Sequence, residues 1–144
     1  NCDWSSDVCS SDLVLAGSAL LDGLKRILRR GAVVAGSSAG AMVLGSWMSF
    51  RPSYGGRMDT LGVLWGVAVL PHHEHSDPDE VVERLDESAP AGTAVLGVDG
   101  KTCCFGGPGG WTVLGQGAVT LYSSGSWQRF ESGQPVPLQT SLSV

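Results

Sequence analysis

The chain has 144 residues, of which 42% are hydrophobic and 16% charged, and its formal net charge is −5. This length and apolar content suit one globular domain, or part of one, with a conventional core. Its 9 lysines and arginines provide few groups to neutralise phosphates, which argues against a nucleic-acid surface. The sequence lacks an apolar run of membrane-spanning length and a signal-peptide pattern, so we expect a cytoplasmic protein that makes no membrane contact.

Residues 1–13 differ in character from the rest of the chain. They show neither helical nor strand periodicity, and they repeat Ser-Ser-Asp within a polar run. This segment resembles one reading frame of a sequencing-library adapter, so we interpret it as a non-native tail, with a natural flexible tail as the alternative. On this interpretation the chain is an N-terminally truncated fragment. Residues 14–138 then form a partial domain, and residues 139–144 form a polar tail.

The first predicted helix carries leucine and isoleucine at helical spacing between Leu20 and Leu28, and Gly31 follows as a stop signal. Basic residues crowd its last turn, where cations complement the helix dipole. We therefore interpret Arg29 and Arg30 as structural residues rather than as a phosphate site.

The β-branched run 32–35 predicts a buried parallel strand, because it shows no polar alternation. A helix is expected over residues 39–47, which completes an α-β-α unit. Residues 49–60 have the composition of a loop that covers a site. Within this loop, Arg51 and Arg57 are candidates to pair with a substrate carboxylate, although exposed arginines are more often simply solvated.

Residues 61–70 form the next apolar run, with a strand expected from about Gly66. Asp77 has the features of a helix N-cap, and Pro78 occupies the first helical position. This helix is expected to continue to about Ser88.

Beyond Pro90 the sequence predicts short strands separated by turn signals. These strands are expected over residues 93–98, 101–105, 111–114 and 118–122, with a last hairpin or edge over 127–138. The glycine-rich run 106–110 links two strands rather than opening a helix, which disfavours a phosphate-binding loop. The whole pattern predicts an α/β fold with a three-layer, doubly wound, mostly parallel sheet and antiparallel hairpins at its C-terminal edge.

The run from Gly36 to Gly40 is typical of a nucleophile elbow. Small residues flank Ser38, because a serine at a sharp strand-to-helix turn has strained backbone geometry and larger neighbours would clash. The same turn directs the Ala39 N–H at the position of a developing oxyanion. The alternative is that Ser38 is an ordinary helix N-cap.

All three histidines lie between His72 and His75, at the carboxyl end of a predicted strand, where open α/β sheets place their sites. His72 is a candidate general base for Ser38. A metal site is a second interpretation, but strand alternation leaves at most two imidazoles per centre, so no metal is expected. The third interpretation is that all three histidines are solvated.

Four blocks of the sequence resemble, in order, a family of serine peptidases. They are the elbow, the segment 61–72 that ends in Pro-His, and the segments 96–102 and 111–122. This family includes dipeptidase E (α-aspartyl dipeptidase) and cyanophycinase, and its fold is class I glutamine amidotransferase-like. The resemblance maps the nucleophile to Ser38 and the catalytic histidine to His72, which lies 34 residues further on.

The resemblance implies a serine hydrolase without a cofactor that cleaves short peptides, with aspartyl peptides as one substrate class. The family places a third catalytic residue, an acid, between the elbow and the histidine strand, but residues 41–58 contain no acid. Asp59, Glu74 and Asp99 are the candidates, and Asp59 is the working choice because it is the first acid after the elbow. The missing acid favours a second hypothesis, a catalytically inactive amidotransferase-like module that binds a ligand or a partner.

Overall fold

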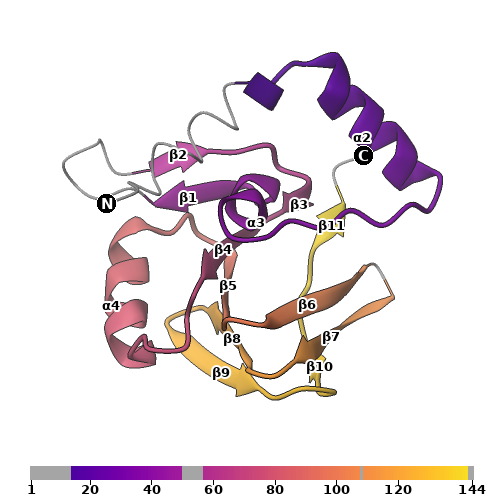
Figure 1. Cartoon of the computed structure of the whole chain (residues 1–144). Helices are drawn as coiled ribbons and strands as arrows, with labels where there is room; N and C mark the ends of the chain where they lie inside the picture. Colours follow the sequence, from indigo (N-terminus) through magenta and orange to yellow (C-terminus); the bar gives the residue numbers. More distant parts are fainter. Residues whose placement is uncertain (1–13, 50–56, 108, 143–144) are drawn as a thin grey trace, which may run out of the picture.

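The computed structural model describes residues 14–49, 57–107 and 109–142 (Figure 1). Its helices are α2 (Ala19–Arg29), α3 (Ala39–Leu44) and α4 (Pro78–Ser88). Its strands are β1 (Trp47–Ser49), β2 (Arg57–Asp59), β3 (Leu64–Trp65), β4 (Val67–Pro71), β5 (Ala94–Val98), β6 (Thr102–Gly107), β7 (Gly110–Gly115), β8 (Val119–Ser123), β9 (Ser126–Phe130), β10 (Pro135–Val136) and β11 (Ser141–Leu142).

A four-stranded sheet in the order β4-β5-β8-β9 forms the centre of the fold. β4 and β5 pair in parallel, with Val67 opposite Ala94 and Pro71 opposite Val98. β8 pairs antiparallel with both β5 and β9. A three-stranded sheet, β10-β7-β6, and two smaller pairs, β1-β2 and β11-β3, surround this centre.

The central sheet has a different hydrophobic layer on each face. Because side chains alternate along a strand, Val95 packs in a cluster with Val81 of α4, whereas Leu96 packs in a cluster with Val113 of β7. Figure 1 shows the corresponding arrangement, with α4 on one side of the β4–β5 pair and the β6–β7 hairpin on the other.

Several predicted elements are present. α2 follows the predicted helix, with the Ser18 hydroxyl accepting a hydrogen bond from the Leu21 N–H. α4 begins after Asp77, whose carboxylate accepts from the Asp79 N–H at 2.9 Å. The antiparallel β6–β7 and β8–β9 pairs also agree with the predicted hairpins.

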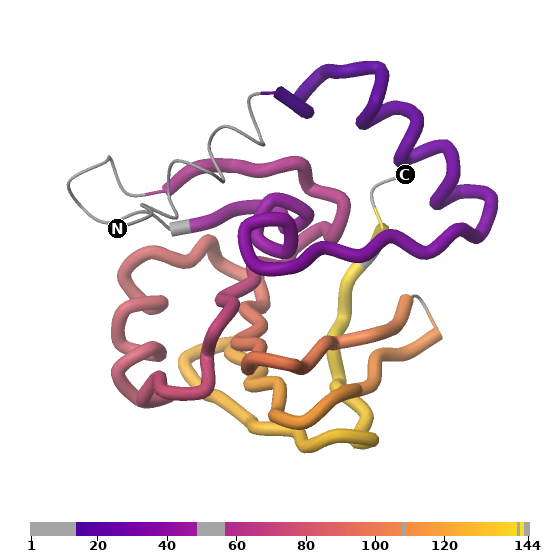
Figure 2. Tube along the Cα trace, in the orientation of Figure 1, coloured from indigo at the N-terminus to yellow at the C-terminus, as the bar shows by residue number. Residues whose placement is uncertain are grey.

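The strand predicted over residues 32–35 is wrong. This segment is extended but forms no strand, and Figure 2 shows it as the connection that leads from α2 to α3. A strand requires hydrogen bonds to a neighbour, and within the described ranges no strand pairs with this segment. Val33 is 72% exposed, so the segment also lacks the burial expected of a parallel strand.

The predicted second helix is too long and the loop predicted after it too extensive. α3 ends at Leu44, because the Ser46 N–H donates instead to the carbonyl of Val67 at the start of β4. The chain then enters β1, which pairs with β2. Residues 50–56, and therefore Arg51, lie outside the described residues.

The segment expected as a polar tail contributes to the fold. β11 pairs antiparallel with β3, and the Thr140 hydroxyl donates to the carbonyl of Trp65 at 2.7 Å. The described strands include one parallel pair beside several antiparallel ones, so the doubly wound, mostly parallel sheet stays a prediction. Among the described residues, none of the helices has the length and apolar character needed to cross a bilayer.

Leu96 tests the larger hydrophobic layer, because its side chain is 2% exposed between β5 and β7. We expect Leu96→Ala to lower the free energy of unfolding by about 2–5 kcal/mol, measured by urea denaturation. The control is Leu114→Ala on β7, where the side chain is 45% exposed and the change should stay within about 0.5 kcal/mol. Equal losses in the two variants would contradict this assignment of the core.

Candidate active site

Ser38 lies at a strained turn between the extended segment 32–37 and helix α3. Its backbone has φ 51° and ψ −118°, a region that residues other than glycine rarely adopt. Its side chain makes no capping hydrogen bond to α3. The N-cap interpretation therefore does not describe this serine, whose hydroxyl is directed elsewhere.

The chain packs closely on itself just before this turn. A Cβ atom added to Gly36 would lie 2.7 Å from both the Gly40 carbonyl carbon and Leu44 Cδ1, which is too close for any side chain. By contrast, a Cβ added to Gly40 would meet nothing within 4 Å among the described residues. The requirement for a small residue is thus visible at Gly36 and not at Gly40.

His72 follows β4 directly and meets Ser38. Its Nε2 atom lies 3.1 Å from Ser38 Oγ, which is hydrogen-bond distance. The His72 backbone also has a positive φ of 57°, so the chain turns sharply as soon as the strand ends at Pro71. The structure therefore brings together the two residues that the sequence singles out as nucleophile and base.

The other two histidines differ from each other. His75 is exposed, but His73 is buried, with 3% of its surface accessible. His73 Nε2 lies 2.6 Å from the hydroxyl oxygen of Tyr122, and the two rings are nearly perpendicular. The interpretation that all three histidines are solvated is therefore wrong, because His73 is buried. Strand alternation does not apply beyond Pro71, because the strand has already ended there.

The three candidate acids occupy different places. Asp59 is exposed on β2 and does not line the cleft that contains Ser38. Glu74 accepts a hydrogen bond from the Gly100 N–H at 2.8 Å. A bond from its own backbone N–H, and next the bond from Gly100, lower its pKa. Asp99 Oδ2 accepts from the Ala118 N–H and pairs with Arg129 at 2.6 Å. Glu74 and Asp99 thus accept hydrogen bonds from backbone N–H groups, and Asp99 also forms an ion pair with Arg129.

Buried polar groups lie behind this turn. Burial lowers the pKa of His73, opposed by the charge of Asp99 and assisted by the charges of Arg129 and Arg84. Burial also raises the pKa of Tyr122 to about 12. Both side chains are therefore neutral at neutral pH. Sequence reasoning missed Tyr122, and its one signal was a polar aromatic residue at the end of a mostly apolar predicted strand.

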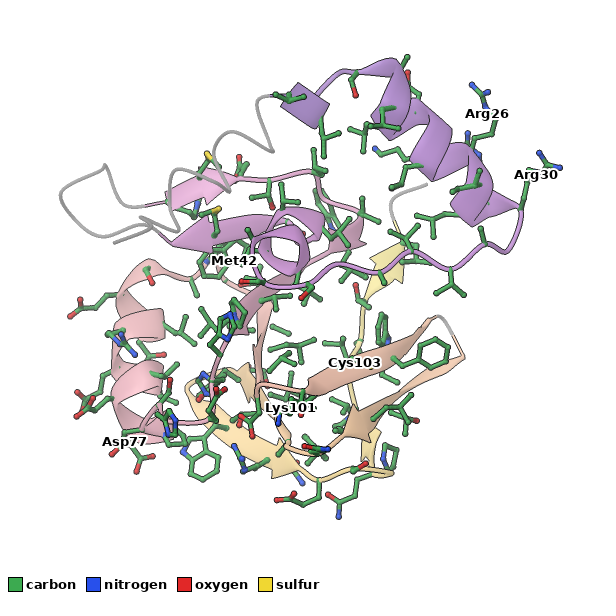
Figure 3. All side chains as sticks on the ribbon, viewed as in Figure 1. Arg26, Arg30, Met42, Asp77, Lys101 and Cys103 are labelled. Carbon is green, nitrogen blue, oxygen red and sulfur yellow. The ribbon has the colours of Figure 1, made fainter. Side chains whose placement is uncertain are left out.

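A cleft of about 500 Å³ contains the Ser38–His72 pair. The segments 32–38 and 98–106 form much of its lining, and Trp111 and Leu142 contribute apolar surface. Lys101 and Cys103, labelled in Figure 3, lie where the chain enters β6. Groups of three or more His, Cys, Asp or Glu side chains suited to a metal ion do not occur in the described part of the chain.

The fold is similar to that of a solved peptidase from an acI-B1 Actinobacterium. The TM-score is 0.50 and the sequence identity 22%, over 69% of this chain. The chain spans 43% of the length of that peptidase. No family model and no curated protein matches this sequence. At this identity the similarity concerns the fold alone.

Gly36 tests the close packing before the elbow. We expect Gly36→Ala to lower the free energy of unfolding by about 1–3 kcal/mol in urea denaturation, because the added methyl group overlaps the α3 backbone. Gly23→Ala is the control: its Cβ meets nothing within 4 Å in the described residues, and alanine favours the α2 helix. If Gly36→Ala is as stable as the unmodified chain, the close approach of Gly36 to α3 is contradicted.

His73 makes stability depend on pH. Its pKa in the folded chain is below the ordinary value of 6.5, so the unfolded chain binds the proton more readily. The free energy of unfolding should therefore fall as pH decreases below 6.5 towards the folded pKa, by up to about 1.4 kcal/mol per pH unit.

Urea denaturation between pH 8 and pH 5 measures this dependence. His73→Gln should lose that part of the slope, whereas the control, His75→Gln, removes an exposed histidine and should keep it. An unchanged slope in His73→Gln would show that His73 titrates alike in both states.

Proposed function

We propose that this chain carries the nucleophile and the general base of a serine hydrolase, a peptidase that acts on short peptides. The observation that carries the proposal is the 3.1 Å approach of His72 Nε2 to Ser38 Oγ at a strained turn. Strain at a positive φ persists only where the surrounding structure enforces it, and it is concentrated at functional sites. A solved peptidase has a similar fold, so peptidase activity is the first to assay.

The chemistry follows from this geometry. Ser38 Oγ attacks the carbonyl carbon of an amide while its proton passes to His72 Nε2. The Ala39 N–H donates to the oxyanion that forms, and in the described residues it has no protein acceptor that competes for this bond. As the C–N bond breaks, His72 gives its proton to the leaving amine nitrogen. Water then hydrolyses the acyl-serine with His72 again as base.

The cleft suits a short peptide. Its volume of about 500 Å³ lies within the range of small-molecule sites. The resemblance to dipeptidase E and cyanophycinase supports acidic peptides, including those with an N-terminal aspartate, as the substrates to assay first. We also propose, on this resemblance, the class I glutamine amidotransferase-like fold for this protein.

A second candidate function is a catalytically inactive module that binds a ligand in the same cleft. The observation that favours it is the set of contacts that the three candidate acids make. Asp99 lines the cleft, but its Oδ2 pairs with Arg129 and its buried Oδ1 has no hydrogen-bond partner among the described residues. Glu74 accepts from the Gly100 N–H, and Asp59 lies away from the cleft. An acid that orients the imidazole contributes up to about 10⁴-fold to the rate in serine proteases.

A fluorophosphonate probe distinguishes the two functions, because a nucleophilic serine displaces its fluoride and keeps the phosphonyl group. We expect labelling of the chain to disappear in Ser38→Ala and its rate to fall by about 100-fold or more in His72→Ala. Mass spectrometry of the labelled peptide locates the modified residue.

The matched control is Ser37→Ala, which removes the neighbouring hydroxyl and should leave labelling intact. Labelling that persists in Ser38→Ala, or that is absent from the unmodified folded chain, would support the inactive module instead. Peptide hydrolysis that EDTA abolishes and Ser38→Ala retains would instead indicate a metal-dependent hydrolase.

A further inference from the structure

We propose that the buried His73–Tyr122 pair is a positioning device for the catalytic base: it fixes the turn at which His72 presents Nε2 to Ser38. This inference rests on the proposed function, because it assigns His73 and Tyr122 a role that acts through His72. Neither residue contacts the reacting atoms. Both are positioning residues rather than catalytic ones.

The need for such a device follows from the backbone of His72. With φ at 57°, this residue occupies a conformation that an L-residue with a Cβ adopts only when its surroundings hold it there. His72 is also exposed, so close packing around its own side chain does not fix the turn. The residues on either side of His72 supply constraints on the backbone at this turn.

On the N-terminal side, Pro71 belongs to β4 and lies opposite Val98 of β5 in the parallel ladder. On the C-terminal side, the His73 N–H donates to the carbonyl of the same Val98 at 3.2 Å. Both neighbours of His72 are thus tied to one point on β5. These two contacts restrict the backbone of His72, which lies between them, to a sharp turn away from β5.

The His73 ring completes the constraint. It lies so close to the Gly97 backbone that any Cβ at position 97 would collide with it. Its Nε2 is 2.6 Å from the Tyr122 hydroxyl oxygen, and the perpendicular contact of the two rings fixes its orientation. Tyr122 itself is 2% exposed and packs in the cluster that includes Val81 of α4. The position of His72 is therefore coupled to the core beneath α4.

The chemistry of the pair also favours this role over simple packing. An apolar side chain would fill the same space without the cost of burying an imidazole, whereas a hydrogen-bonded ring has a single orientation. The charged groups that act on His73 are Asp99, Arg129, Arg84 and Glu74. Asp99 and Glu74 raise the pKa of His73, whereas Arg129 and Arg84 lower it, and Asp99 and Arg129 form an ion pair.

The experiment measures the rate of fluorophosphonate labelling in a double-mutant cycle. Tyr122→Phe removes the hydroxyl and keeps the ring, so the packing of the core is preserved. We expect its limiting labelling rate to fall by about 10- to 100-fold, with probe affinity unchanged, because a small displacement of a base costs this much. In the His72→Ala background the same substitution should leave the residual rate unchanged within about 2-fold, because the base it positions is gone.

Trp127→Phe is the matched control. It removes a hydrogen bond of 2.7 Å from the Trp127 indole N–H to Asp79, which joins β9 to α4 outside the pair. Its labelling rate should equal that of the unmodified chain. All rates are taken at a temperature where circular dichroism shows each variant fully folded, or are divided by the folded fraction, so that instability does not imitate mispositioning.

Two outcomes would overturn the inference while leaving the proposed function intact. In one, Tyr122→Phe labels at the unmodified rate although His72→Ala does not. In the other, Tyr122→Phe lowers the rate by the same factor with and without His72, as a general structural defect would. If His72→Ala itself labels at the unmodified rate, the proposed function fails, and this inference fails with it.

Discussion

The parallel pairing of β4 with β5 is the constraint on which the candidate site depends. It determines where β4 ends, because Pro71, the last residue of β4, lies opposite Val98 of β5. Two residues further on, the His73 N–H donates to the carbonyl of Val98. The start of β4 is equally defined, since the carbonyl of Val67 receives the Ser46 N–H just after α3. One strand thus connects the end of the elbow helix to the base that faces the beginning of that helix.

This arrangement places two strained residues opposite each other. Ser38 and His72 both have positive φ, and they come from segments that contact only through tertiary structure. Neither conformation is favourable alone, so each must be supported by the packing around it. On the serine side the support is the close approach of Gly36 to α3. On the histidine side it is the β5 ladder and the buried ring of His73.

The sequence predicts best those elements whose signals are local. α4 has a capping aspartate and a proline at its start, so it is predicted close to its observed bounds. The β6–β7 hairpin consists of two short strands joined by a glycine-rich turn, and its bounds are also predicted closely. The pairing of Ser38 with His72 is also predictable, because a turn motif and a strand-end histidine are each recognisable in sequence. The strand expected at residues 32–35 fails for the opposite reason: apolar β-branched residues supply propensity, but a strand exists only beside a partner. The contact of His73 with Tyr122 escapes prediction because the two residues are 49 positions apart and meet only through the pairing of β5 with β8.

Helix α2 has a consequence for how the molecule opens. None of its residues is buried, and Leu20 and Ile27 are 66% and 45% exposed, so unwinding it uncovers little additional apolar surface. Its amide protons should therefore exchange with solvent through local fluctuations, whereas those of β5 and β8 should exchange only through global unfolding. Ser38 lies in the chain between α2, where exchange through local fluctuations is expected, and the strands of the central sheet. Its hydroxyl meets His72 at the end of β4, and its backbone leads on one side into α3, which packs on β4, and on the other side back towards α2.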